Sequence, residues 1–165
     1  MRMLTKTGAM LAASLLLAVQ PAQAQDAPAD PNAQNPAWHM QQQAYLLGLT
    51  AEDGWHFEPG GVRWRWLQYR AAQAKPTVAD VVTVHYEGKL LDGTVFDSSY
   101  ARGEPATFPL ARLVKGWQIA IPRMGVGEII EIAIPADLAY GPVGRGPIPG
   151  NATLVFKVEL IGIGG

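Results

Sequence analysis

Two aromatic residues and one carboxylate stand close together in the segment Val82–Ser99, VTVHYEGKLLDGTVFDSS. The segment has the pattern of a strand that ends at Tyr86, a Leu-Asp-Gly turn, and a second strand that ends at Phe96 and Asp97. On adjacent antiparallel strands, this spacing can place the three side chains beside one another. The chain has no cysteine and its three histidines are scattered, so the sequence offers neither a metal cluster nor a nucleophile–base pair. The chemistry that remains is an apolar aromatic pocket with a single acid.

The first 24 residues have the features of a secretory signal peptide. Arg2 and Lys6 precede an apolar run from Gly8 to Val19, and Ala22-Gln23-Ala24 is a small-x-small cleavage site. The run is shorter than the roughly 20 residues that span a bilayer. We expect export to the periplasm, with secretion into the medium left open. A retained N-terminal anchor is the less favoured interpretation.

The rest of the chain has the length of one domain. Cleavage would leave about 141 residues with a net charge of about −3, and this acidic balance argues against a general nucleic-acid partner. Burial alone must stabilise the fold, since no disulfide can form. We expect a flexible leader and a short helical extension over residues 25–57, and the folded domain over residues 58–165.

The extension contains a candidate helix over Ala37–Leu49, AWHMQQQAYLLGL, with Gly48 at its end. Its role is open between a brace or lid on the domain and a dimerisation element. The segment is short, so we expect a monomer.

The first strand of the domain is expected in VRWRWLQYR, where alternation places Arg63 and Arg65 on one face and Trp64 and Trp66 on the other. Interleaved basic and aromatic residues can bind single-stranded nucleic acid. A half-exposed strand explains the same alternation without a partner, and the acidic balance favours this interpretation.

The remaining pattern predicts short strands, one short helix and long connections. Lys115–Met124 is the expected helix, and Pro122 should end it because proline lacks the backbone N–H. Ser98–Pro105 is expected to be a polar loop, and Pro135–Pro149 is a long connection that must be mobile or held by specific contacts. Together with strands over residues 81–86, 94–97, 128–134 and 152–161, these elements predict an α+β domain with a curved antiparallel sheet.

Six motifs in this order resemble those of the FKBP-type peptidyl-prolyl cis-trans isomerases, which are macrolide-binding immunophilins: VHYEG, DGTVFDSS, VKGW, MGVGE, IPADLAYG and IPGNATLVFKVEL. The signal peptide points to an exported bacterial member. The resemblance runs from about Gly61 to Leu160. It implies a strongly bent antiparallel sheet, a half-barrel of about five to six strands, wrapped around one short α-helix. It also implies an isomerase that accelerates rotation of Xaa-Pro bonds without a cofactor or metal. The implied partners are proline-containing unfolded or partly folded exported polypeptides and macrolides such as tacrolimus or rapamycin.

The resemblance also assigns roles to individual residues. Trp117 would be the floor of the pocket, Asp97 would lie at its rim within reach of Tyr86 and Arg102, and the Tyr140 hydroxyl would donate to a substrate carbonyl. The catalytic set that it implies is Tyr86, Phe96, Asp97, Trp117, Tyr140 and Phe156, and the substrate-binding set is Arg102, Leu113, Val114 and Ile148.

The chain departs from the family pattern at three places. Ala106 stands where many members have a second aromatic wall, and the connection from Phe108 to Trp117 is shorter than in compact eukaryotic members. From both changes we expect a pocket that is open on one side and that does not bind macrolides tightly. Arg145 stands where some members have a histidine, which can change substrate preference.

An alternative function is a periplasmic chaperone that holds unfolded chains with weak or no isomerase activity. Extra apolar surface for this role would come from Trp38, Trp55, Trp64 and Trp66. The sequence names neither the clients nor the preferred residue before proline.

Overall fold

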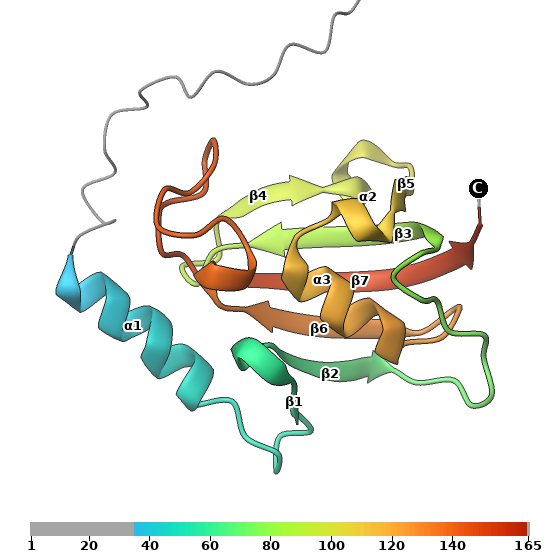
Figure 1. Ribbon diagram of the computed structural model, residues 1–165, viewed down its shortest axis with the longest axis horizontal. Helices are drawn as coiled ribbons and strands as arrows, with labels where there is room; N and C mark the ends of the chain where they lie inside the picture. The colour runs from blue at the N-terminus through green and yellow to red at the C-terminus, as the bar shows by residue number, and fades with distance from the viewer. Residues whose placement is uncertain (1–34, 165) are drawn as a thin grey trace, which may run out of the picture.

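The computed structural model describes residues 35–164, so the expected signal peptide lies outside the described part of the chain. An antiparallel sheet curves around helix α3 (Lys115–Ala120), helix α1 (Pro36–Leu47) lies beside one end of the sheet, and one-turn helix α2 (Ser99–Arg102) follows strand β4 (Figure 1). No helix within residues 35–164 is long and apolar enough to cross a membrane. The strands are β1 His56–Phe57, β2 Arg63–Gln68, β3 Val81–Lys89, β4 Val95–Ser98, β5 Ala106–Pro109, β6 Ile129–Ile134 and β7 Leu154–Ile163.

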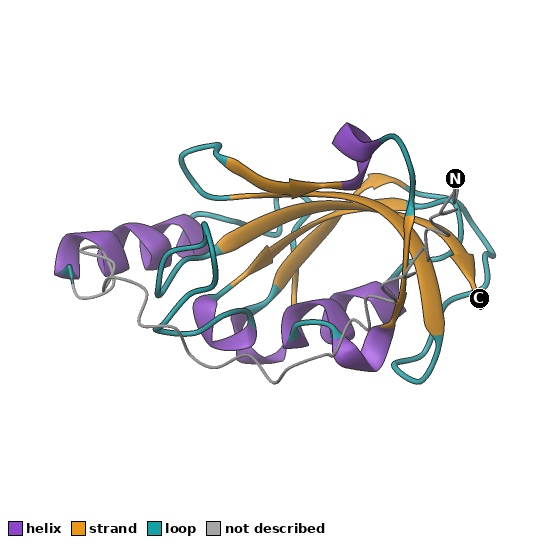
Figure 2. Cartoon of the chain, turned by 90° about the horizontal axis from the view of Figure 1, so that it is seen from above, coloured by secondary structure: helices purple, strands orange, loops and turns teal. Residues whose placement is uncertain are grey.

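The sheet has seven strands in the order β1-β2-β6-β7-β3-β4, and β5 also pairs with β3. Every pairing is antiparallel. The sheet bends over α3 and stays open, so the helix lies against its concave face (Figure 2). The predicted α+β fold with a strongly bent sheet is therefore confirmed. The sheet has more strands than the expected five to six, because the short strands β1 and β5 were not predicted.

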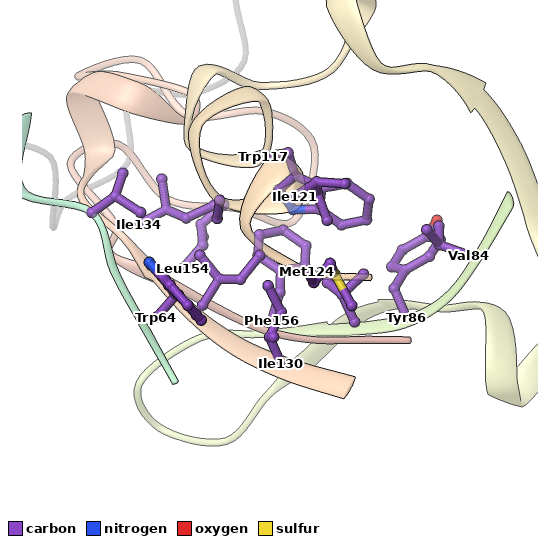
Figure 3. Close-up of a cluster of buried hydrophobic side chains, with 14 of the residues drawn as sticks. Trp64, Val84, Tyr86, Trp117, Ile121, Met124, Ile130, Ile134, Leu154 and Phe156 are labelled. Carbon is purple, nitrogen blue, oxygen red and sulfur yellow. The ribbon is translucent and has the colours of Figure 1, made fainter. Parts of the chain in front are cut away.

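Alternation along the central strands builds the core. In β3, buried residues alternate with half-buried ones over the whole strand, and Val84 and Tyr86 lie opposite Leu160 and Val158 of β7. The side chains of the concave face meet those of α3 and of the 3-10 turn that follows it (Figure 3). This cluster includes Trp64, Val84, Tyr86, Trp117, Ile121, Met124, Ile130, Ile134, Leu154 and Phe156.

Helix α3 lies directly on the sheet because Gly116 carries no side chain. A Cβ at this position would lie 2.4 Å from Cγ2 of Ile134 on β6. The α-helix ends at Ala120, before Pro122, and the chain continues as a 3-10 turn over Ile121–Arg123. The predicted helix is thus present, and proline limits it as expected.

Three local predictions need correction. The expected polar loop Ser98–Pro105 contains α2, because Ser98 Oγ accepts a hydrogen bond from the Ala101 N–H at 3.2 Å and Gly103 (φ +78°) ends the turn. Strand β3 continues to Lys89 rather than ending at Tyr86, because β7 pairs with it along that whole length. Strand β5 covers residues 106–109, where no strand was predicted.

Helix α1 begins and ends close to its predicted limits. Asn35 accepts the Ala37 N–H at 2.9 Å at its start, and Gly48 follows its last turn. The chain then turns and enters β1, and Trp55, just before this strand, is 5% exposed. The extension is therefore packed against the sheet, while the predicted domain boundary near Glu58 stays a prediction.

Candidate active site

A cavity of about 420 Å³ opens between the sheet, α3 and the connection that follows β6. Its surface is mainly apolar, and aromatic rings form much of it. The lining residues are Tyr86, Phe96, Asp97, Phe108, Leu113, Val114, Trp117, Tyr140, Arg145, Gly146, Pro147, Ile148 and Phe156.

The floor of this pocket is the indole of Trp117, which is 4% exposed. Its ring meets Tyr86 and Phe156 edge to face, with centroid distances of 5.4 Å and 5.3 Å, and Phe156 meets Phe96 in the same way at 5.6 Å. Such edge-to-face pairs are worth about 0.5–1.5 kcal/mol each beyond the area that they bury. The rings therefore support one another's orientation.

A β-bulge brings two consecutive residues of β4 to the same pocket. Gly88 of β3 lies opposite Asp97, but the next residue, Lys89, lies opposite Val95, so Phe96 is the extra residue. In a regular strand, neighbours point to opposite faces, and the bulge removes this restriction. Gly88 is needed here, because a Cβ would lie 2.6 Å from the Phe96 ring.

The polar rim is a three-residue network. The Tyr86 hydroxyl donates to Asp97 Oδ2 at 2.5 Å, Arg102 pairs with the other Asp97 oxygen, and Arg102 Nη2 donates to the Tyr86 hydroxyl at 3.0 Å. Burial by itself would raise the pKa of the Asp97 carboxyl, but the hydrogen bonds from Tyr86 and Arg102 outweigh it and hold this pKa below its usual value. Burial, followed by the bond to Asp97, raises the pKa of Tyr86. The rim thus holds an ionised acid and a protonated phenol.

The long connection after β6 supplies the remaining wall and is held by backbone contacts. Arg145 and Ile148 form two backbone hydrogen bonds at 2.9 Å and 3.0 Å. Gly144 (φ +75°) lies against this bridge, where a Cβ would be 2.2 Å from the Ile148 carbonyl oxygen. Within residues 35–164, the Tyr140 hydroxyl has no hydrogen-bond partner, and the Arg145 guanidinium lies 5.8 Å from the Tyr140 ring centroid. The connection was predicted to be either mobile or held by specific contacts, and in the structure specific contacts hold it.

The structure brings the predicted site residues together. Nine of them line the pocket: Tyr86, Phe96, Asp97, Leu113, Val114, Trp117, Tyr140, Ile148 and Phe156. The tenth, Arg102, does not line it but belongs to the rim network through its hydrogen bonds to Tyr86 and Asp97. The assignment of catalytic and binding roles to these residues stays a prediction.

Four lining residues are absent from the predicted set: Phe108, Arg145, Gly146 and Pro147. Phe108 lies two residues after Ala106 on β5, opposite Val82, and its ring centroid is 6.2 Å from that of Tyr86. Ala106 itself does not line the pocket, and β5 contributes an aromatic wall at Phe108 instead. The alternation of Ala106 and Phe108 with Thr107 and Pro109 is the signal that could have indicated this strand.

The residues that suggested a chaperone, a nucleic-acid-binding strand or a metal site do not line the pocket. Trp55 and Trp64 are buried, so they do not provide the extra apolar surface expected of a chaperone. Arg65 is paired with Glu131 at 2.7 Å, which agrees with a structural explanation of the basic and aromatic strand. His85 lies on the face opposite Tyr86 and is bonded to Ser99 Oγ at 2.9 Å. In the part of the chain that the structure describes, no three His, Cys, Asp or Glu side chains are grouped to hold a metal.

Comparison with known proteins places the pocket in a family context. The family model of the FKBP-type peptidyl-prolyl cis-trans isomerases matches residues 72–161, more than half of the chain. The chain is 56% identical over 102 residues to the peptidyl-prolyl cis-trans isomerase Mip of Coxiella burnetii, an alignment that covers 59% of this chain and 44% of that one. It is 52% identical over 95 residues to FK506-binding protein 2 of Debaryomyces hansenii, covering 56% and 70% of the two chains.

A solved structure shares the architecture. The crystal structure of FkpA from Escherichia coli matches with a TM-score of 0.71 and 35% identity, over 75% of this chain and 58% of that chain. The chain thus spans less than half the length of the Coxiella relative and somewhat more than half of the solved FkpA chain. The bent sheet, the aromatic pocket and these matches agree, and the chain belongs to the FKBP-type peptidyl-prolyl cis-trans isomerase family.

Proposed function

We propose that this chain is a peptidyl-prolyl cis-trans isomerase that acts on exported polypeptides and assists their folding. The observation that carries the proposal is the apolar pocket with the Trp117 floor, whose ring walls leave a cavity of about 420 Å³. A cavity of this kind suits a proline ring and the amide that precedes it.

The reaction needs no covalent step. Rotation about a peptide bond has a barrier of about 18–20 kcal/mol, because the nitrogen lone pair is shared with the carbonyl. Isomers of an Xaa-Pro bond are close in energy, but they interconvert over tens to hundreds of seconds. An enzyme that binds the twisted amide better than the planar forms accelerates the rotation in both directions.

The pocket favours the twisted amide for a physical reason. Twisting removes the conjugation, so the amide is less polar than in its planar forms and loses less when it leaves water. Trp117, Phe156 and Ile148 would hold the proline ring in these surroundings. An acceleration of about 10⁴-fold requires only about 5.5 kcal/mol, which desolvation and one or two oriented hydrogen bonds can supply.

Polar groups at the rim would orient the substrate. The Tyr140 hydroxyl is available to donate to the carbonyl before proline. Asp97 would act as an electrostatic partner at the rim, with its position set by Tyr86 and Arg102. Phe96, Leu113 and Val114 line the remaining pocket wall and would contact residues next to the proline.

The substrates would be proline-containing unfolded or partly folded chains, and the pocket would also take macrolides such as tacrolimus or rapamycin. The name of the Debaryomyces relative, FK506-binding protein 2, supports the second class. The signal-like residues 1–24 support action in the periplasm, and the short extension supports a monomer.

The test is cis-to-trans exchange of an Xaa-Pro tetrapeptide with the chain from Gln25 onward, measured by NMR with and without a macrolide. NMR is preferable to fluorescence because the chain has five tryptophans. Acceleration that a macrolide blocks would support an isomerase with an intact pocket. Acceleration that a macrolide does not block would mean that the chain is an isomerase that does not bind the macrolide. No acceleration in a folded sample would favour the chaperone alternative.

A further inference from the structure

We propose that helix α1 is a clasp for the pocket: it holds the connection between β6 and β7 in its substrate-binding conformation, and Trp38 is its main positioning residue. The inference rests on the proposed function, because it assigns to the extension a part in substrate binding at that same pocket. It concerns a segment outside residues 72–161, to which the family model is matched.

The evidence is a row of contacts from one side of α1 to the end of the connection. The Trp38 indole N–H donates to the Gly150 carbonyl oxygen at 3.2 Å. His39 Nε2 and Asn151 Nδ2 lie 3.1 Å apart in a hydrogen bond. One turn further along α1, these contacts are continued by buried Gln42.

Gln42 contacts Thr153, the residue that precedes β7, through two of its oxygen atoms. Its side-chain carbonyl oxygen accepts the Thr153 N–H at 2.8 Å, and its backbone oxygen accepts from the Thr153 hydroxyl at 3.5 Å. Figure 1 and Figure 2 both show α1 lying alongside the connection that runs into β7. Three positions of the helix therefore contact residues 150, 151 and 153 in turn.

The held residues are linked directly to the pocket wall. Asn151 donates its backbone N–H to the Gly141 carbonyl oxygen at 2.9 Å, and Gly141 follows Tyr140 in the chain. Gly150 is two residues beyond Ile148, which is fixed to Arg145 by the backbone bridge. A movement of residues 150–151 would therefore shift both pocket residues of the connection: Tyr140 through the bond to Gly141, and Ile148 through the chain itself.

The clasp has a specific kinetic consequence. If it is released, the connection spends only part of the time in the binding conformation, and the apparent affinity for substrate falls in proportion to that fraction. Once substrate has bound, the wall is again in place. Release should therefore raise KM and leave kcat unchanged, whereas a general loss of folding would lower the amount of active enzyme.

The test is the substitution Trp38→Phe in the full chain, which removes the indole donor and keeps an aromatic ring packed against the core. Met40→Gln is the matched control, because Met40 lies on the same helix and is 70% exposed. We expect Trp38→Phe to raise KM for an Xaa-Pro tetrapeptide roughly two- to tenfold, the range that one net hydrogen bond corresponds to. Amide exchange at Gly141 and Asn151 should accelerate, while exchange at Val158 in β7 stays unchanged.

A second variant tests the adjacent contact. Asn151→Gly removes the side-chain bond to His39 and keeps the left-handed backbone conformation (φ +60°) that Asn151 has. It should produce the same rise in KM and the same local exchange. Equal KM and equal loop exchange in Trp38→Phe, Met40→Gln and the parent would overturn the clasp.

Two other outcomes are also decisive. Faster exchange throughout β7 with a lower Tm would mean that α1 is a general stabilising element, and would equally overturn the clasp. If the parent chain has no isomerase activity, the proposed function fails, and the exchange rates at Gly141 and Asn151 still decide whether α1 holds the connection.

Discussion

Replacing Trp117 with leucine should damage isomerisation more than replacing Asp97 with asparagine. Trp117 makes two edge-to-face contacts, with Tyr86 and Phe156, at 5.4 Å and 5.3 Å. Each such pair contributes about 0.5–1.5 kcal/mol, so the substitution removes about 1–3 kcal/mol of organisation from the pocket. If the twisted amide loses the same stabilisation, kcat/KM falls roughly 5- to 150-fold.

The acid at the rim should matter less. The Asp97 and Arg102 side chains are 42% and 46% exposed, and exposed ion pairs contribute little because water already solvates both groups. Asparagine also keeps an oxygen that can accept the Tyr86 hydroxyl. We expect Asp97→Asn to lower kcat/KM by no more than about fivefold.

The assay is NMR exchange of an Xaa-Pro tetrapeptide, with circular dichroism to show that each variant is folded. Trp66→Leu is the matched control, because Trp66 also makes edge-to-face contacts, at 4.6 Å with Trp64 and 5.2 Å with Tyr69, but does not line the pocket. It should lose stability without a comparable loss of kcat/KM. If Asp97→Asn were the most damaging substitution in a folded protein, catalysis by apolar burial would be wrong.

Three further predictions concern stability. Gly116→Ala should lower the free energy of unfolding by about 1–3 kcal/mol in urea, because its methyl group would lie 2.4 Å from Ile134 Cγ2; an unchanged value would mean that α3 can move off the sheet. Glu128→Gln should lower the free energy of unfolding by about 1–3 kcal/mol. The two oxygens of the buried Glu128 side chain accept the backbone N–H groups of Arg70 at 2.9 Å and Gly125 at 2.8 Å, and an amide keeps only one of these acceptors. An unchanged melting temperature would contradict this. The stability that ionised Asp97 contributes should be fully present above the ordinary carboxyl pKa of about 3.9 and disappear as the pH falls through its lower folded pKa. Unfolding of the parent chain and Asp97→Asn at several pH values measures this, and a difference that grows toward acid pH would have the wrong sign.

The depressed pKa of Asp97 also bears on activity. Since its folded pKa lies below the usual value, the rim acid is ionised throughout the neutral range. Isomerisation should therefore be independent of pH between about 5 and 8 as far as this group is concerned.

Much of the site was predictable because its residues lie in short local motifs. Tyr86 could be assigned from the strand and turn pattern around it, whereas Trp117 and Phe156 were assigned through the motifs that resemble the family. The alternation in β3 and β7 marked the faces that become buried. Periodicity is a local property, so the chain carries it before any strand has found its partner.

Pairing between distant strands determined what periodicity left open. Alternation alone would place Phe96 and Asp97 on opposite faces of β4, and only the bulge opposite Gly88 brings both to the pocket. Strand β5 is four residues long and is defined by its pairing with β3, so Phe108 had no strong local signal.

Residue patterns along the chain were enough to predict the main strands and the α3 helix, and the motifs that resemble the family supplied nine of the residues that line the pocket. The way in which the pocket is closed depends on tertiary contacts: the bulge at Phe96, the wall at Phe108, and the contacts from Trp38 and Gln42 across more than 100 residues of chain. The physical reason is that hydrophobic alternation and turn residues act within a few positions, whereas register and long-range hydrogen bonds depend on which segments meet after the whole chain has folded.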